Sequence, residues 1–135
     1  MTEHPNAIAL RHAYAAMAAG DLPTVLAAFA PDAVVHIGGS GPMSGDHKGH
    51  EAIGAALMHG FELTGGTQRL DVRDVFADAE HGIVVLRETA TRAADGKTLD
   101  VMETNLFRFG PDGRAAEFWD VPADPKLHDD FFDGI

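Results

Sequence analysis

One stretch of the sequence, from Glu103 to Asp120, constrains the fold more than any other. It reads ETNLFRFGPDGRAAEFWD, in which two alternating apolar runs flank the turn signal GPDG at residues 110–113. Alternation with a period of two is typical of β-strands that bury one face. The stretch therefore predicts a long β-hairpin, with strands over residues 98–109 and 114–121.

One face of this hairpin mixes apolar and polar side chains. Because successive side chains of a strand point to opposite sides, the first arm places on one face Val101, Glu103, Asn105, Phe107 and Phe109. By the same rule the second arm places on one face Ala116, Phe118 and Asp120. Small-molecule pockets have this character, since they are mostly apolar with a few placed polar groups. We therefore expect the floor of a pocket for a small apolar organic ligand.

The first half of the chain predicts three helices. Residues 6–19 carry apolar side chains at helical spacing, and Gly20 follows as a C-terminal cap. Asp21 is the predicted N-cap of a second helix, whose apolar stripe runs to Phe29, and residues 51–63 predict a third helix. Between them we expect a short strand over residues 33–37. The glycine-rich residues 38–49 are expected to form a loop or an irregular hairpin.

The second half predicts a meander of four strands and a short terminal helix. The strands are expected over residues 68–77, 83–92, 98–109 and 114–121, and Asp124-Pro125 starts the helix. This order predicts an α+β fold, as one domain over residues 1–135, with the helices covering one face of a curved sheet. The other face carries Met102, Thr104 and Leu106, an apolar pattern that predicts a homodimer through the sheet.

The charge and hydropathy of the chain argue against two classes of partner. The formal net charge is −11, whereas nucleic acids and anionic membrane surfaces require clustered Lys and Arg. No apolar run approaches the roughly 20 residues of a membrane helix, and the N-terminus lacks the pattern of a signal peptide. We therefore expect a cytoplasmic protein that binds neither nucleic acid nor membrane.

The sequence predicts neither a metal site nor a cofactor. There is no cysteine, so a thiolate site is excluded. Among the eight histidines, His47 and His50 lie three apart, but no third histidine or carboxylate follows at a recognised ligand spacing. The glycines of residues 38–49 lack the lysine and serine that end a phosphate-binding loop.

The order and spacing of several segments resemble the nuclear transport factor two-like superfamily, specifically its SnoaL-like polyketide cyclase branch. The matching segments are AGDLPTVLAAFAPDAVVH, GPMSG with GHEAI, LTGGT and DGRAAEFWD. The resemblance implies a cone, in which a bent, mostly antiparallel sheet wraps around three N-terminal helices and encloses a pocket. It also implies a homodimer. Proteins of this fold include ketosteroid isomerases, limonene epoxide hydrolases and scytalone dehydratases, and also pure binding modules.

Three residues are candidates for catalysis. Asp120 ends an apolar strand in a WD motif that resembles that of SnoaL-like cyclases, whose aspartate is the proposed acid/base. Asn105 is a candidate donor to an oxyanion, and His36 is a candidate base or proton relay. Each residue also has a structural interpretation. Asp120 could cap the last helix or pair with an arginine, Asn105 could bond to backbone, and His36 could be a satisfied core histidine.

Six further side chains are expected to line the pocket: Tyr14, Glu103, Phe107, Phe118, Trp119 and Asp74. Two departures from the related enzymes argue against steroid isomerase chemistry. Ala13 stands where those enzymes place a catalytic tyrosine, so that Tyr14 would face another direction on the helix, and Ile37 stands where they place a catalytic aspartate.

Together these features predict a cofactor-independent enzyme that transfers protons on a small apolar carbonyl compound. The alternative is a module that binds such a compound unchanged.

Overall fold

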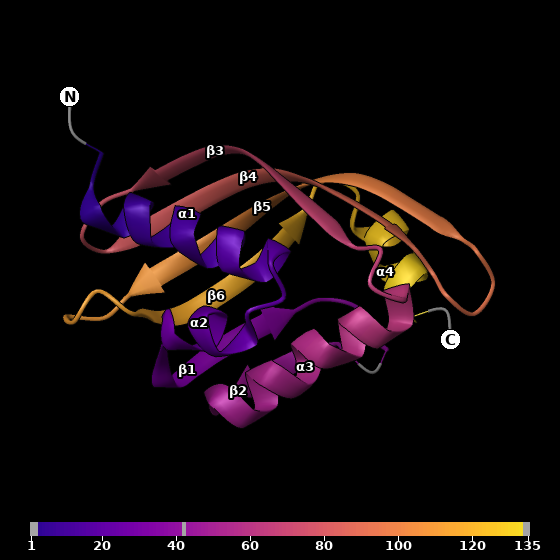
Figure 1. The fold of residues 1–135 in the computed structure, drawn as a ribbon, viewed down its shortest axis with the longest axis horizontal. Helices are drawn as coiled ribbons and strands as arrows, with labels where there is room; N and C mark the ends of the chain where they lie inside the picture. The colour runs from indigo at the N-terminus through magenta and orange to yellow at the C-terminus, as the bar shows by residue number, and fades with distance from the viewer. Residues whose placement is uncertain (1–2, 42, 134–135) are drawn as a thin grey trace.

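The computed structural model describes residues 3–41 and 43–133. Pro42 of the GPMSG segment lies outside the described residues, as do the last two residues of the predicted terminal helix region. The described chain forms four helices and a six-stranded sheet in the order β2-β1-β6-β5-β4-β3 (Figure 1). The predicted α+β fold with a curved, mostly antiparallel sheet is confirmed.

Three helices precede the long strands, as predicted: α1 (Pro5–Ala18), α2 (Leu22–Ala27) and α3 (Gly49–Thr64). Asp21 caps α2 by accepting a 3.3 Å hydrogen bond from the backbone N–H of Thr24. Gly65 ends α3 in the left-handed conformation, with φ of 58°, which glycine adopts without steric cost. The prediction that Phe29 belongs to the second helix is wrong, because α2 ends earlier and Phe29 begins a strand.

The predicted meander is formed by β3 (Arg69–Ala77), β4 (His81–Thr91), β5 (Thr98–Phe109) and β6 (Ala115–Pro122). Two further strands extend the sheet beyond β6. The strand β1 (Phe29–Ile37) pairs with β6 in parallel, and β2 (Gly45–Lys48) pairs with β1 in antiparallel. Part of the glycine-rich segment thus forms a hairpin, which is one of the two forms expected for it. The register between β1 and β6 shifts between Phe29 and Val34, where Pro31 has no N–H to donate.

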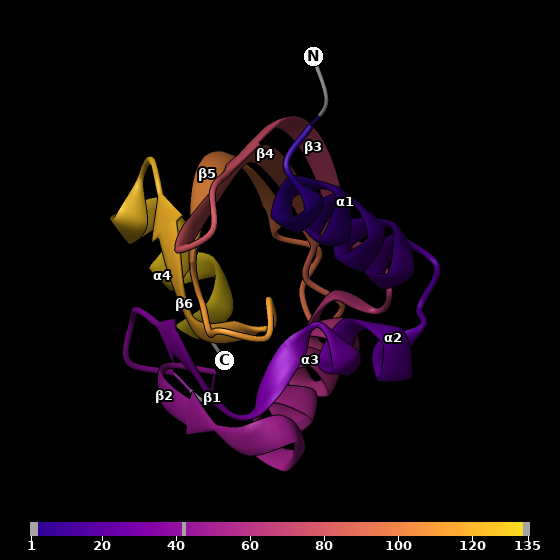
Figure 2. The same cartoon turned by 90° about the vertical axis from the view of Figure 1, so that its left-hand side faces the viewer.

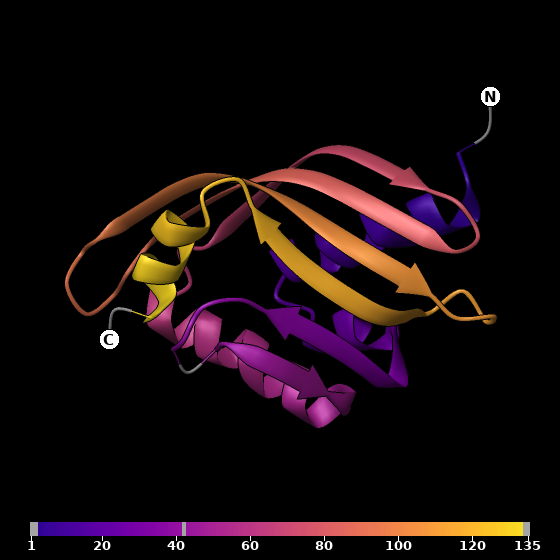
Figure 3. The same cartoon turned by 180° about the vertical axis from the view of Figure 1, so that it is seen from behind.

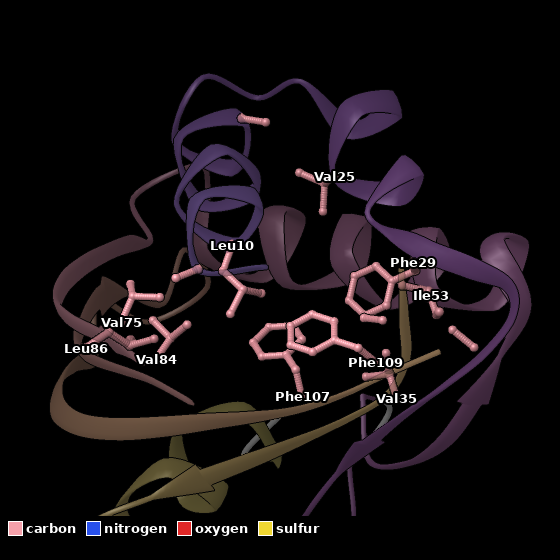
Figure 4. Packing of buried hydrophobic residues seen from close by; sticks show 14 residues of the cluster. Leu10, Val25, Phe29, Val35, Ile53, Val75, Val84, Leu86, Phe107 and Phe109 are labelled. Atoms are coloured by element: carbon pink, nitrogen blue, oxygen red, sulfur yellow. The ribbon is translucent and has the colours of Figure 1, made fainter. Parts of the chain in front are cut away.

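The sheet bends around the helices, so that its inner face and the helices share one core. Figure 2 shows β3, β4 and β5 arching beside α1, with α3 lying along the opposite side. In Figure 4, side chains from α1, α3, β1 and β5 point toward one another, among them Leu10, Ile53, Phe29 and Phe107. Burial of these apolar side chains supplies the main driving force for this arrangement.

The terminal helix α4 (Pro125–Asp133) closes one end of the inner face. It buries His128, Phe131 and Phe132, and the two aromatic rings pack against Leu99 and Val101 of β5. Figure 3 shows α4 beyond the end of β6, with the four meander strands facing the viewer. The described part of the terminal segment therefore does not cover the outer face of the sheet.

The outer face carries apolar side chains from four strands. Its members, which include the residues predicted from the sequence, are Phe76, Ile83, Val85, Met102, Thr104, Leu106, Trp119 and Val121. Val84 and Leu86 have the opposite parity and are fully buried in the core. None of the helices in the described ranges combines the length and apolar character that a membrane span requires.

Candidate functional site

A cavity of about 170 Å³ lies between the helices and the inner face of the sheet. Most of its wall is apolar, with side chains from α1, α2, α3, β1, β5 and β6, among them Leu10, Val25, Ile53, Val35, Phe107 and Phe118. A cavity with such walls favours ligands that are themselves largely apolar.

One end of the cavity is polar. Seven polar side chains meet there from α1, the segment before β3, β4, β5, β6 and α4: Tyr14, Gln68, Glu88, Glu103, Asn105, Asp120 and His128. The strand register explains the grouping, because Glu103 and Asn105 share a face of β5 and Asn105 lies opposite Asp120 on β6. Among the described residues that line the cavity, none is Lys or Arg.

A chain of hydrogen bonds fixes the orientation of Asp120. The Tyr14 hydroxyl donates to Oδ1 of Asn105, and Nδ2 of Asn105 donates to Oδ1 of Asp120 at 3.0 Å. Burial raises the pKa of the Asp120 carboxyl above its usual range, although His128 and Asn105 partly oppose this. Burial also raises the pKa of Tyr14 well above its ordinary value, so its hydroxyl stays protonated and acts as a donor.

The imidazole of His128 lies among three carboxyl groups. Its Nε2 is 3.2 Å from Oε1 of Glu103, 3.3 Å from Oε1 of Glu88 and 3.4 Å from Oδ2 of Asp120. The side chains of Glu88, Glu103 and His128 are all buried. Among the described residues the two Oε1 atoms nonetheless have no hydrogen-bond donor in good geometry.

This crowding separates the protonation states of the buried acids. Burial raises the pKa of Glu103 to about 10, and the neighbouring charges of Glu88 and Asp120 add to the effect. Burial lowers the pKa of His128, but the carboxyl groups of Glu103 and Glu88 outweigh it and raise that pKa to about 11. Burial also opposes the charged form of Glu88, yet its contacts with His128, Glu103 and Gln68 outweigh this and lower the pKa. At neutral pH the site therefore holds two proton donors, Glu103 and His128, beside a proton acceptor, Glu88.

The structure brings six of the residues singled out from the sequence to this cavity: Tyr14, Glu103, Asn105, Phe107, Phe118 and Asp120. Tyr14 is one position away from the place that a catalytic tyrosine takes in ketosteroid isomerases. It nevertheless lines the cavity, as does Ala13, its neighbour on α1.

Three other residues singled out from the sequence lie outside the cavity: His36, Trp119 and Asp74. His36 bonds through Nδ1 to Asp46 at 2.7 Å and through Nε2 to Glu117 at 2.6 Å, and its ring stacks on Trp119. The reason is strand parity: Val35 and Phe118 line the cavity, so the residues that follow them point to the outer face. Asp74 likewise precedes the buried Val75 and is exposed.

Three polar residues of the site were not singled out from the sequence: Glu88, Gln68 and His128. A signal for Glu88 exists, because it continues the buried alternation of Val84 and Leu86 along β4. For His128 the signal is its spacing of three and four from Phe131 and Phe132, which places it on the apolar stripe of a short helix. That stripe is easily overlooked beside the neighbouring aspartates.

Comparison with known proteins supports the same fold and family. The SnoaL-like domain family matches residues 10–118. An uncharacterized protein of Mycobacterium tuberculosis is 29% identical over 133 residues, covering 98% of this chain and 99% of that protein. The structure of Bal32a, from a soil-derived mobile gene cassette, is 35% identical with a TM-score of 0.87, covering 94% of this chain and 95% of that chain. A protein of unknown function with a cystatin-like fold from Xanthomonas campestris is 25% identical with a TM-score of 0.86, covering 96% of this chain and 98% of that chain.

Proposed function

The chain belongs to the SnoaL-like domain family, and we propose that its cavity binds a small, largely apolar carbonyl compound and transfers protons on it. In this proposal Asp120 is the acid/base, and the reaction is of the cyclase, isomerase, dehydratase or hydrolase type. The observation that carries the proposal is the position of Asp120. It lies at the polar end of an apolar cavity, with one carboxyl oxygen held by Asn105.

The neighbours of Asp120 suit proton transfer. A carboxyl group in a site that excludes water is a stronger base than one in solution, which is the property that a general base requires. The bond from Asn105, itself oriented by Tyr14, holds one carboxyl oxygen of Asp120 and so reduces the cost of reaching a productive geometry.

The role of proton relay passes from His36 to His128 in this proposal. His36 lies on the outer face, whereas Nε2 of His128 is 3.4 Å from Oδ2 of Asp120. His128 and Glu103 both hold a proton at neutral pH and are buried beside Asp120, so they can return a proton to the ligand after Asp120 has taken one.

The test begins with identification of the ligand. Native mass spectrometry of the protein purified from its own host should show a retained compound of small, apolar, carbonyl-bearing type. Incubating that compound with excess wild-type protein should give a product in solution. Asp120→Asn should abolish product formation, because the amide cannot accept the proton, while circular dichroism and ligand retention stay unchanged.

The matched control is Asp74→Asn, which makes the same change at an exposed site on β3 and should leave turnover at the wild-type level. Full activity of the Asp120→Asn protein contradicts the assignment of the acid/base.

A second candidate function is ligand binding without catalysis. It is favoured by the bonding of Asn105, whose oxygen accepts from Tyr14 and whose nitrogen already donates to Asp120. This leaves few donors for a developing oxyanion. Release of the compound unchanged from the wild-type protein, after many cycles of binding, would favour this alternative.

A further inference from the structure

Two buried carboxylate oxygens at the polar end of the cavity lack a hydrogen-bond donor. They are Oε1 of Glu88 and Oε1 of Glu103, whose side chains are only 3% and 4% exposed. A buried carboxylate oxygen without a donor or a cation destabilises the fold, because it has lost its bonds to water and gained none in return. A nitrogen that lies beside both oxygens is Nε2 of His128, which carries at most one proton. Apart from the exchangeable protons that Glu103 and His128 hold, neither oxygen has a partner within the described chain, and a cation could take the place of those protons.

These three atoms have the spacing of ligands around a single metal ion. All of them lie within 4.8 Å of one another. Zinc bonds to nitrogen and oxygen of about 2.0–2.2 Å place neighbouring ligands of a tetrahedral ion roughly 3.3–3.5 Å apart. The distances of 3.2 and 3.3 Å from Nε2 to the two oxygens are close to this range, so little rearrangement is needed.

Neighbouring groups orient these side chains as the outer shell of a metal site does. Gln68 donates to the other carboxyl oxygen of Glu88 and so aims Oε1 at His128. The Nδ1 atom of His128 faces Oδ1 of Asp129 at 3.7 Å. A carboxylate on that side favours the proton at Nδ1 once metal binding has displaced the proton from Nε2.

We infer that Glu88, Glu103 and His128 bind one divalent cation, for which Zn²⁺ is the best match. Mixed imidazole and carboxylate ligands at tetrahedral spacing suit Zn²⁺, whereas Mg²⁺ prefers six oxygen ligands. Three protein ligands leave a fourth position for a ligand oxygen, which the ion would polarise. The inference rests on the two unpartnered oxygens and their spacing and not on the proposed proton transfer, although a bound ion would displace the protons that His128 and Glu103 hold in that proposal.

Isothermal titration of the full chain with Zn²⁺ alone, after removal of metals by a chelator, tests the site. One ion per chain should bind with a dissociation constant of about 1 µM or tighter. The heat should vary with the ionisation enthalpy of the buffer, because metal binding displaces protons from its ligands. Glu103→Gln and His128→Gln should each weaken binding by about 100-fold, since each removes one ligand.

Two variants distinguish binding at this site from binding elsewhere on the chain and from the proposed proton transfer. His12→Gln changes an exposed histidine on α1 and should bind Zn²⁺ like the wild type. Asp120→Asn should keep the ion while losing turnover, so that failure of the metal site and failure of the proposed function are distinguishable.

Binding that survives both Glu103→Gln and His128→Gln would assign the ion to surface groups and overturn the inference. Because either variant could fail to fold, Co²⁺ absorption of the wild-type chain gives an independent reading. Visible bands of tetrahedral Co²⁺ at one ion per chain support the site. The absence of both Zn²⁺ and Co²⁺ binding to the wild-type chain at 1 mM metal would also overturn the inference.

Discussion

At the scale of single residues, strand parity decides which of two neighbouring polar groups reaches the cavity. Asp120 lines it and Trp119 does not, and Val35 lines it and His36 does not. His36 instead belongs to a network of ion pairs on the outer face. It bonds to Asp46 and Glu117, and Glu117 also bonds to Arg108. This network makes a separate, testable contribution to stability.

The network predicts a pH-dependent effect of His36→Gln. The hydrogen bonds to Asp46 and Glu117 raise the pKa of His36 in the folded state. A histidine whose pKa is higher in the folded state stabilises the fold. The full contribution is present at pH values below the pKa of the unfolded state, about 6.5, and it is lost as the pH rises through the pKa of the folded state. Urea denaturation should therefore show that His36→Gln costs roughly 1 kcal/mol or less at pH 5.5, and less at pH 9. The same loss at both pH values would contradict this account, and His12→Gln is the control.

At the scale of elements, sequence patterns predict what is local and fail where pairing is distant. The four meander strands follow from period-two alternation and turn signals, and α1, α2 and α3 follow from apolar spacing and caps. The parallel pairing of β1 with β6 joins residues more than 80 apart, for which no local pattern exists. Four of the seven polar residues of the site were singled out from the sequence. Asn105 and Asp120 share one hairpin, whereas His128 reaches the cluster only because α4 folds back.

The contact between α1 and β4 gives a prediction at this scale. A Cβ atom added to Gly82 would lie 2.7 Å from Cδ1 of Leu10 and 3.0 Å from the ring of Phe109. Leu10 and Phe109 are both buried and would both have to shift, so Gly82→Ala should lower the free energy of unfolding by about 1–3 kcal/mol. Thermal denaturation measures this loss. Gly110→Ala, where the nearest atom would be at an ordinary 3.5 Å, is the control, and equal stability of both variants would refute the close approach.

At the scale of the whole molecule, the outer face of the sheet is the feature without a partner in the described chain. Phe76, Ile83, Leu106 and Trp119 form one row across four strands, because each lies opposite the next in the register. Phe76 and Val121 are 59% and 52% exposed. An exposed patch of several apolar side chains is unusual on the surface of a monomer. We propose a two-fold homodimer through this face, burying roughly 800 Å² or more per partner.

Leu106→Lys should shift this dimer toward monomer, because it places a charge at the centre of the apolar row. Light scattering coupled to size exclusion at micromolar concentration measures the change. Ile8→Lys, which adds the same charge at an exposed position on α1, should leave the dimer intact. A monodisperse monomer of the wild-type protein would rule the dimer out.

Exchange of solvent deuterium into the ligand tests proton transfer by Asp120 most directly. The compound retained from the host is incubated in D₂O with the wild-type protein or with Asp120→Asn, and mass spectrometry follows its mass. Proton transfer by Asp120 predicts that the wild type adds deuterium to the ligand at a carbon-bound position and that Asp120→Asn slows this by at least about 100-fold. Equal rates of exchange in the two proteins, or no exchange above the rate in buffer, would contradict it.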